Sequence, residues 1–267
     1  MRPLDIVVCM KPVPDPRRWG KLKLDPRTML LQRADVPAVV NPLDRNAIEQ
    51  AVALRAERGG TVTVISMAPP DAGEQLAEAL AMGCDRAFLL SDPAFAGADS
   101  LATARCLAAA VRRLGPVDLV FCGSYSLDGS TSQVGPQVAE LLDLPDLTHV
   151  TALTLEGDGL RARCRVEHGE AVYDCALPAL VTFDKEVNAP RLPTMRGIMK
   201  AAAAGVTTWG AADIGVAPGE VGLAGSPTQM LNVFQSPSTR KGEMLEGTPN
   251  RVAAALVEKL RAARLVE

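Results

Sequence analysis

The stretch Val117–Val134 (VDLVFCGSYSLDGSTSQV) decides the fold of this 267-residue chain. It opens with an apolar run, Val117–Cys122, passes through small and hydroxyl-bearing residues, and is expected to enter a helix that extends to Leu142. A buried strand, a loop and a helix in this order form the repeating unit of a parallel sheet that is covered by helices. The stretch therefore predicts an α/β fold.

The same alternation of strand and helix runs through the preceding sequence. Short apolar runs predict further buried strands at Leu4–Met10, Thr61–Met67 and Arg86–Leu90. The segments between them predict helices over 41–60, 73–83 and 99–114, the first of which begins at Asn41-Pro42, a good N-cap followed by a residue that fits the first turn. Because parallel strands are joined by right-handed crossovers, we predict a doubly wound, mostly parallel sheet.

The pattern changes after residue 150. Thr151–Ala176 consists of short alternating pieces with turn signals between them, which is typical of an antiparallel meander, and Leu177–Phe183 is a buried strand that rejoins the main sheet. Residues 206–249 are rich in Gly, Pro, Ser and Thr and are too long for an internal loop, so we expect an extended arm that ends in the amphipathic helix Arg251–Leu265. The chain is thus divided into an α/β domain, residues 1–205, and an arm with a terminal helix, residues 206–267.

The composition excludes several classes of protein. A net charge of −3 argues against nucleic-acid binding, which normally requires a basic stripe. No apolar run approaches the ~20 residues of a membrane span, and the first residues lack the pattern of a signal peptide, so we expect a cytoplasmic protein without a span. Aromatic residues make up only 3% of the chain, fewer than we expect of a protein that holds a flat cofactor or a large partner alone.

Metal and disulfide chemistry are not expected. None of the six cysteines forms a C-x-x-C pair and most lie in apolar runs, so they are interpreted as small buried side chains in a reducing compartment: Cys9, Cys84, Cys106, Cys122, Cys164 and Cys175. Only His149 and His168 could join them in a zinc site.

The loop after Val117–Cys122 predicts phosphate binding rather than catalysis. Small residues let the backbone approach a ligand, and free N–H groups at a helix start favour phosphate. A Ser-capped helix after a tight loop is the alternative. The loop lacks the G-x-G-x-x-G and G-x-x-x-x-G-K-[ST] patterns, and Gly123–Leu127 fails G-x-S-x-G at its last position. We therefore predict a nucleotide-binding α/β protein with no catalytic residues.

Four segments resemble a known family. They are Cys9–Asp15 (CMKPVPD), Asn41–Asp44 (NPLD), Asp128–Pro136 (DGSTSQVGP) and Pro190–Lys200 (PRLPTMRGIMK). Together they resemble the β subunit of electron transfer flavoproteins, and the likeness runs nearly from end to end. This resemblance implies an electron-transfer carrier subunit rather than an enzyme, since a bound cofactor supplies the redox chemistry.

The resemblance also implies which residues act. The residues expected to bind the adenine nucleotide are Cys9, Asn41, Pro42, Leu43, Asp44, Met67, Gly123, Ser124, Tyr125, Ser126, Leu127, Asp128, Gly129, Ser130, Thr131, Ser132, Gln133 and Val134. Pro193, Met195, Ile198 and Met199 correspond to the segment that recognises a partner flavin dehydrogenase, such as an acyl-CoA dehydrogenase, with Met195 at the anchor position. In the family an α subunit completes a heterodimer and holds most of the FAD, and the arm and final helix embrace that subunit.

The family divides on the occupant of the β-subunit site. It is a structural AMP in one branch and a second FAD in the electron-bifurcating branch, where it accepts hydride from NADH. Val13-Pro14-Asp15 and the segment from Gly129 to Pro136 favour the second FAD, although Ser130 stands where an acidic residue is usual. Two other functions stay open at this point: a stand-alone adenine-nucleotide sensor of the same fold, and a flavin reductase that acts alone.

Overall fold

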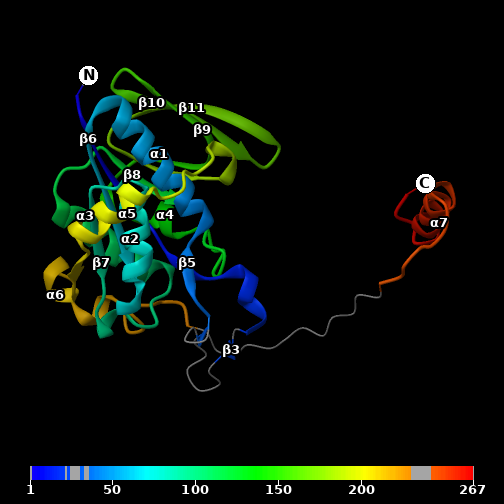
Figure 1. The fold of residues 1–267 in the computed structure, drawn as a ribbon, viewed down its shortest axis with the longest axis horizontal. Helices are drawn as coiled ribbons and strands as arrows, with labels where there is room; N and C mark the ends of the chain where they lie inside the picture. The colour runs from blue at the N-terminus through cyan, green and yellow to red at the C-terminus, as the bar shows by residue number, and fades with distance from the viewer. Residues whose placement is uncertain (1, 22, 25–30, 33–35, 230–241, 267) are drawn as a thin grey trace. The chain divides into compact units, whose positions relative to one another are not determined.

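The computed structural model describes residues 2–21, 23–24, 31–32, 36–229 and 242–266. The chain forms two compact units, Met1–Leu231 and Asn232–Glu267. Most of the chain belongs to the first unit (Figure 1). This unit includes the residues predicted to bind the nucleotide and those predicted to recognise a partner.

A large sheet forms the centre of the first unit. Among the described residues it has nine strands in the order β11-β10-β9-β12-β8-β1-β6-β7-β13. Their bounds are β1 Leu4–Cys9, β6 Gly60–Met67, β7 Arg86–Leu90, β8 Leu119–Gly123, β9 Asp146–Glu156, β10 Gly159–Val166, β11 Gly169–Ala176, β12 Ala179–Phe183 and β13 Thr207–Trp209. The pairs from β9-β12 through β7-β13 are parallel, whereas β9, β10 and β11 pair antiparallel. The predicted parallel sheet with a meander is confirmed.

Helices cover both faces of this sheet (Figure 1). The helices are α1 Pro42–Arg58, α2 Gly73–Met82, α3 Ser100–Leu114, α4 Val134–Leu142, α5 Met195–Ala204 and α6 Ala211–Ile214, with short 3-10 turns at Pro16–Lys21, Pro70–Ala72, Pro93–Phe95, Lys185–Val187 and Pro218–Glu220. Apolar side chains of α1, α2 and α5 belong to one core layer, and those of α3, α4 and α6 to the other. The fold is therefore doubly wound, as predicted.

Alternation along the central strands supplies both layers. In β1, Ile6 and Val8 enter the first layer while Val7 and Cys9 enter the second. Successive side chains of a strand point to opposite faces, so a strand that is buried on both faces must be apolar throughout. This requirement explains why the continuous runs in the sequence identified the central strands correctly.

Two boundaries can be compared with the prediction. β9 begins at Asp146 and first pairs in parallel with β12, and its antiparallel pairing with β10 begins at Val150, within one residue of the predicted Thr151. Thr207–Trp209, assigned by the sequence pattern to the arm, instead pair with β7 as the edge strand β13. Trp209 also stacks on Phe88, with ring centroids 4.1 Å apart, and this contact fixes the strand at the edge.

Smaller strands connect the sheet to the entrance of α1. β2 (Pro12–Pro14) pairs antiparallel with β5 (Ala38–Val40), and β3 (Lys23–Leu24) pairs with β4 (Leu31–Gln32). The Asn41 N–H donates to the Lys11 carbonyl at 3.0 Å, which continues the β2-β5 pairing to the start of α1. The end of β1 and the start of α1 are thereby held side by side.

The second unit contains the predicted terminal helix. It is α7, Pro249–Ala262, and none of its residues is buried. Part of the predicted arm, residues 230–241, lies outside the described residues. Within the described parts of the chain, no helix combines the length and the apolar character needed to cross a membrane.

Candidate functional site

A cavity of about 960 Å³ opens at the carboxyl ends of the parallel strands β1, β6, β7 and β8. This edge is where an open parallel sheet normally binds its ligands. Fourteen of the eighteen residues predicted to bind the nucleotide line it, namely Cys9, Asn41, Asp44, Met67, Gly123, Ser124, Tyr125, Ser126, Asp128, Gly129, Thr131, Ser132, Gln133 and Val134. The structure therefore gathers these residues around one space.

The other four predicted residues do not line the cavity. Pro42 occupies the first turn of α1, and Leu43 is buried beneath Gly123. The Leu127 N–H donates to Asn41 Oδ1 at 3.2 Å, and the Ser130 N–H donates to the Ser126 carbonyl at 2.9 Å, so both groups are engaged in holding the loop. These four residues support the walls.

Asp44 joins three separate segments of the chain. Its carboxylate accepts the Lys11 N–H at 2.7 Å, the Gly123 N–H at 3.0 Å and the Asn41 side-chain amide at 3.1 Å. Burial raises the pKa of Asp44 to about 6, although each of these hydrogen bonds lowers it. A Cβ at Gly123 would collide with the Asp44 carboxylate, so only glycine fits there. The ends of β1 and β8 are thus fixed to the first turn of α1.

Asn41 holds the loop that follows β8. Its Nδ2 donates to the Tyr125 carbonyl at 2.9 Å, while its Oδ1 accepts the Leu127 N–H. Asn41 stands at the N-cap position of α1, as predicted, but its side chain makes no capping hydrogen bond to the helix. Its side chain is committed instead to the loop and to Asp44.

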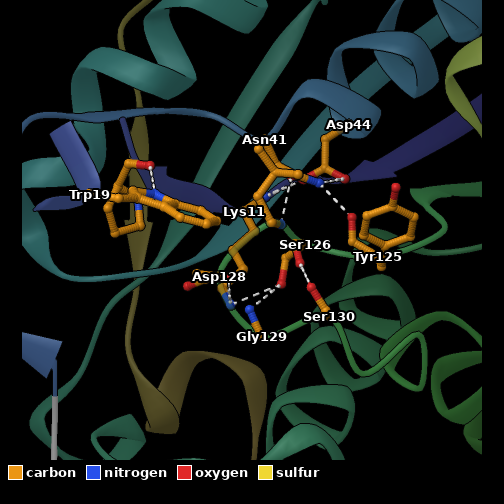
Figure 2. A network of polar contacts seen from close by, with 11 residues as sticks. Lys11, Trp19, Asn41, Asp44, Tyr125, Ser126, Asp128, Gly129 and Ser130 are labelled. Carbon is orange, nitrogen blue, oxygen red and sulfur yellow. Dashed lines mark hydrogen bonds and ion pairs between the residues drawn. The ribbon is translucent and has the colours of Figure 1, made fainter. Parts of the chain in front are cut away.

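Lys11 closes the other side of the loop (Figure 2). Lys11 Nζ lies 2.7 Å from Asp128 Oδ1 and 3.3 Å from Ser126 Oγ. The Asp128 side chain is 6% exposed, and that of Lys11 is 42% exposed. The sequence analysis included Lys11 in the family-like segment Cys9–Asp15 but gave it no role, although a lysine shortly after a central strand reaches this edge of the sheet.

The loop leads into an uncapped helix. Ser130 and Ser132 have φ values of 51° and 55°, in the left-handed region that such residues rarely adopt. Gln133 occupies the N-cap position of α4 without a side-chain hydrogen bond to the helix, so the alternative of a Ser-capped helix is wrong. The first N–H groups of α4 have no partner within the helix, and they border the cavity at Val134 and Gly135.

The start of the neighbouring helix, α3, is capped by a side chain. Asp99 accepts the Ala102 N–H at 2.9 Å as the N-cap of α3, and its other oxygen accepts the Thr228 N–H at 3.0 Å. Ser100 Oγ donates to Gln133 Oε1 at 2.9 Å, which links α3 to the start of α4. Of these two helix starts on the cavity, α4 is therefore the one that suits an anion, since Asp99 brings negative charge to α3.

One wall was missed by sequence reasoning. It follows β6 and β7 and includes residues 68–70, 91–93 and 95–100, together with Thr103, Leu107 and Thr228. The rule that ligands lie beyond the carboxyl ends of parallel strands could have identified Ser91 and Asp92, which follow β7. Nothing in the local sequence pointed to Thr228. Phe95 and Tyr125 are the aromatic residues among the described lining.

The predicted partner-recognition segment lies outside the cavity, on α5 and the residues before it. Thr194 caps α5 by accepting the Gly197 N–H at 3.0 Å. Met195, Ile198 and Met199 are exposed, with Met195 at 76%, and Pro193 is half-buried. Gly197 packs so closely on the Ala81 carbonyl of α2 that a Cβ would collide with it. The segment thus presents apolar side chains on a fixed base.

An ion pair fixes the start of this segment. The Arg191 guanidinium contacts both oxygens of Glu49 on α1, at 2.7 and 2.8 Å, and the Arg191 N–H donates to the same carboxylate at 2.9 Å. The hydrogen bond from the Arg191 side chain lowers the pKa of Glu49. Such a two-pronged pair is more directional than a single contact.

Comparison with known proteins gives the family. An electron transfer flavoprotein domain matches residues 28–214. The CarD subunit of the caffeyl-CoA reductase-Etf complex of Acetobacterium woodii is 43% identical over 98% of this chain and 99% of its own length. The electron transfer flavoprotein subunit beta of Thermoanaerobacterium thermosaccharolyticum is 42% identical over 98% and 100%, and protein FixA of Azorhizobium caulinodans is 41% identical over 96% and 94%. The chain belongs to the family of electron transfer flavoprotein β subunits.

Proposed function

We propose that this chain is one half of a heterodimeric electron transfer flavoprotein, binds an adenine nucleotide in the cavity, and passes electrons from NADH or flavin dehydrogenases to a redox partner. The observation that carries the nucleotide site is the start of α4, whose first residues have no side-chain cap and border a cavity that Lys11 also lines. A helix start of this kind stabilises the negative charge of a phosphate.

The rest of the cavity suits the remainder of a nucleotide. Apolar residues such as Met67, Phe95 and Leu107 line one part of it, and Ser124, Ser126 and Thr131 supply hydroxyl groups. Pockets for nucleotide-sized ligands combine mostly apolar walls with a few polar groups in this way. The residues present therefore fit an adenine nucleotide, with the phosphate at α4.

A second FAD is the occupant we favour over AMP. The segments Val13–Asp15 and Gly129–Pro136 resemble the branch that carries two flavins. The cavity of about 960 Å³ is also lined by residues 91–93 and 95–100 and by Thr228, and a space of this size supports a dinucleotide as its occupant. Asp44 and Asn41 hold the loop by its backbone, so the chain can enclose the nucleotide without aromatic stacking.

This function requires no acid, base or nucleophile from the chain. A bound flavin supplies the electron chemistry, while the protein supplies binding, orientation and a fixed electrostatic environment. The α subunit is proposed to hold the main FAD, and the exposed segment around Met195 to contact a flavin dehydrogenase such as an acyl-CoA dehydrogenase.

Nucleotide analysis of the co-expressed heterodimer tests the proposal. After denaturation, two FAD per heterodimer support the two-flavin form, whereas one FAD and one AMP limit the chain to the simpler form. A chain that purifies as a stable, colourless monomer and ignores an α subunit would contradict the electron-carrier function. That result would favour a stand-alone nucleotide sensor.

A further inference from the structure

Two cysteines meet at the floor of the cavity. β1 and β8 are neighbouring parallel strands in which Val7 lies opposite Val120 and Val8 opposite Phe121. Continued by one residue, this register sets Cys9 opposite Cys122, at the carboxyl end of both strands. Backbones of neighbouring strands lie ~4.8 Å apart. Cys9 and Cys122 enter the same core layer as Val7 and Val120, so their side chains lie on the same face of the sheet.

The two thiols lie together at the cavity. Cys9 and Cys122 both line it, although each is only 6% exposed. The neighbouring Cys9 side chain, burial and the nearby Asp44 raise the pKa of the Cys122 thiol well above its usual range. Two thiols on one face of the sheet thus border the space proposed for the nucleotide.

We propose that Cys9 and Cys122 form a dithiol site that captures a trivalent arsenical at the floor of the cavity and thereby excludes the nucleotide. The capture step rests on the two strands alone, whereas the exclusion rests on the proposed nucleotide site.

The chemistry of capture is balanced without an oxidant. An organoarsenic(III) oxide condenses with two thiols: two S–H bonds break, two As–S bonds form, and the oxygen leaves as one molecule of water that carries both protons. Neither arsenic nor sulfur changes its oxidation state. The overall condensation consumes two thiols and releases no net proton, so the raised pKa of Cys122 does not oppose its equilibrium. The raised pKa slows the attack, because the thiolate is the nucleophile.

The geometry selects this pair over the other cysteines. Two cysteines on neighbouring strands can chelate one atom only if their sulfurs lie on the same face of the sheet. Soft sulfur ligands favour soft acceptors such as arsenic(III). The free cysteine Cys164 is also buried on a strand, but it lies on β10 in the opposite core layer. Cys164→Ala is therefore a matched control for Cys9→Ala and Cys122→Ala.

Phenylarsine oxide tests capture on the full-length chain after removal of bound nucleotide. Intact-mass analysis should show one phenylarsenic group per chain, released by a small dithiol but not by a monothiol. Cys9→Ala and Cys122→Ala should each lose this adduct, and Cys164→Ala should keep it. An adduct that survives Cys122→Ala would overturn the proposal.

A measurement on the unaltered chain covers the case in which a variant fails to fold. Peptide mapping of the labelled wild-type protein should find arsenic bridging the peptides that contain Cys9 and Cys122. A bridge between any other pair of cysteines would overturn the site.

Competition between the nucleotide and phenylarsine oxide distinguishes the proposed dithiol site from the proposed nucleotide site. Saturation with FAD or AMP should slow the labelling. If the nucleotide binds and labelling proceeds at an unchanged rate, the exclusion is wrong. If the bridge forms at Cys9 and Cys122 but neither nucleotide binds the chain or its heterodimer, the dithiol site stands and the proposed nucleotide function fails.

Discussion

The Asp44 carboxylate accepts the backbone N–H of Gly123 across 3.0 Å, and thereby ties α1 to the end of β8. The same carboxylate also accepts the Lys11 N–H from the end of β1. A single buried side chain thus sets the spacing of the segments that form the cavity.

Asp44→Asn should change how stability depends on pH. The folded chain binds the Asp44 proton more tightly than the unfolded chain, because the pKa is about 6 instead of 3.8. The contribution of Asp44 to the unfolding free energy is therefore full below pH 3.8 and is lost as the pH rises to about 6. The pKa difference corresponds to about 3 kcal/mol.

Urea unfolding of nucleotide-free protein at about pH 4 and pH 7 measures this effect. Asn cannot titrate, and it leaves one backbone N–H without an acceptor, at a cost of about 1–3 kcal/mol at both pH values. The unfolding free energy of the wild type minus that of Asp44→Asn should decrease as the pH rises from about 4 to 7. A difference that stays constant across this range would show that Asp44 does not titrate there.

Gly123→Ala should damage the cavity more than Gly129→Ala. A methyl group at Gly123 meets the Asp44 carboxylate and Leu43, whereas at Gly129 its nearest neighbour is Ser126 Oγ at 3.4 Å. Forcing a methyl group into a packed site costs about 1–3 kcal/mol. Calorimetry should show a lower melting temperature and weak nucleotide binding for Gly123→Ala. Equal behaviour of the two variants would argue against close packing at Gly123.

Lys11→Met should weaken nucleotide binding without unfolding the chain. Lys11 is the basic side chain among the described lining residues, so its loss removes a positive charge from the cavity that α4 borders. A partly exposed ion pair such as Lys11–Asp128 contributes only about 0–1 kcal/mol to stability. Titration at two salt concentrations should show lower affinity and a smaller salt dependence than in the wild type.

Arg2→Met is the control for this experiment. The Arg2 guanidinium lies 2.6 Å from the Asp118 carboxylate. This ion pair is at the amino ends of β1 and β8, whereas the cavity and the start of α4 are at their carboxyl ends. Its substitution should leave nucleotide affinity unchanged. If Lys11→Met and Arg2→Met both bind the nucleotide as tightly as the wild type, Lys11 has no part in holding the phosphate.

Met195→Asp should slow electron transfer to the partner dehydrogenase and leave the flavin content unchanged. A charge at this exposed position opposes burial in an apolar contact, while the cavity remains intact. Met195→Leu keeps the apolar character and should preserve the rate. Stopped-flow measurements with the reduced dehydrogenase report the rate, and absorbance reports the flavin. Loss of flavin in Met195→Asp would assign the segment a structural role.

Much of the fold could be predicted because a strand that is buried on both faces appears in the sequence as a nearly continuous apolar run. The strands β1, β6, β7 and β8 place mostly apolar side chains on both faces, and their helices alternate with them. β13 could not be predicted, since its three residues are held at the edge by the Trp209–Phe88 stack and by pairing with β7. Such a contact between distant segments leaves no local pattern.

The candidate site, like the fold, could be predicted only in part. The loop after β8 and the start of α1 carried recognisable motifs, and the structure places them around one cavity. The use of Asn41 was not predictable, because its amide reaches the Tyr125 carbonyl, 84 positions away, instead of capping its own helix. Thr228 joins the wall for a similar reason, through its N–H to Asp99.

The separation of the two core layers has a consequence for how this protein can diversify. α5 packs in the layer of α1 and α2, while α4, which borders the cavity, packs in the other. Substitutions on the outer surface of α5 can therefore accumulate without disturbing the groups around α4. If the segment around Met195 contacts the electron donor as proposed, exchanging a few of its side chains could bring in a new donor, and the proposed nucleotide cavity would pass unaltered into the new complex.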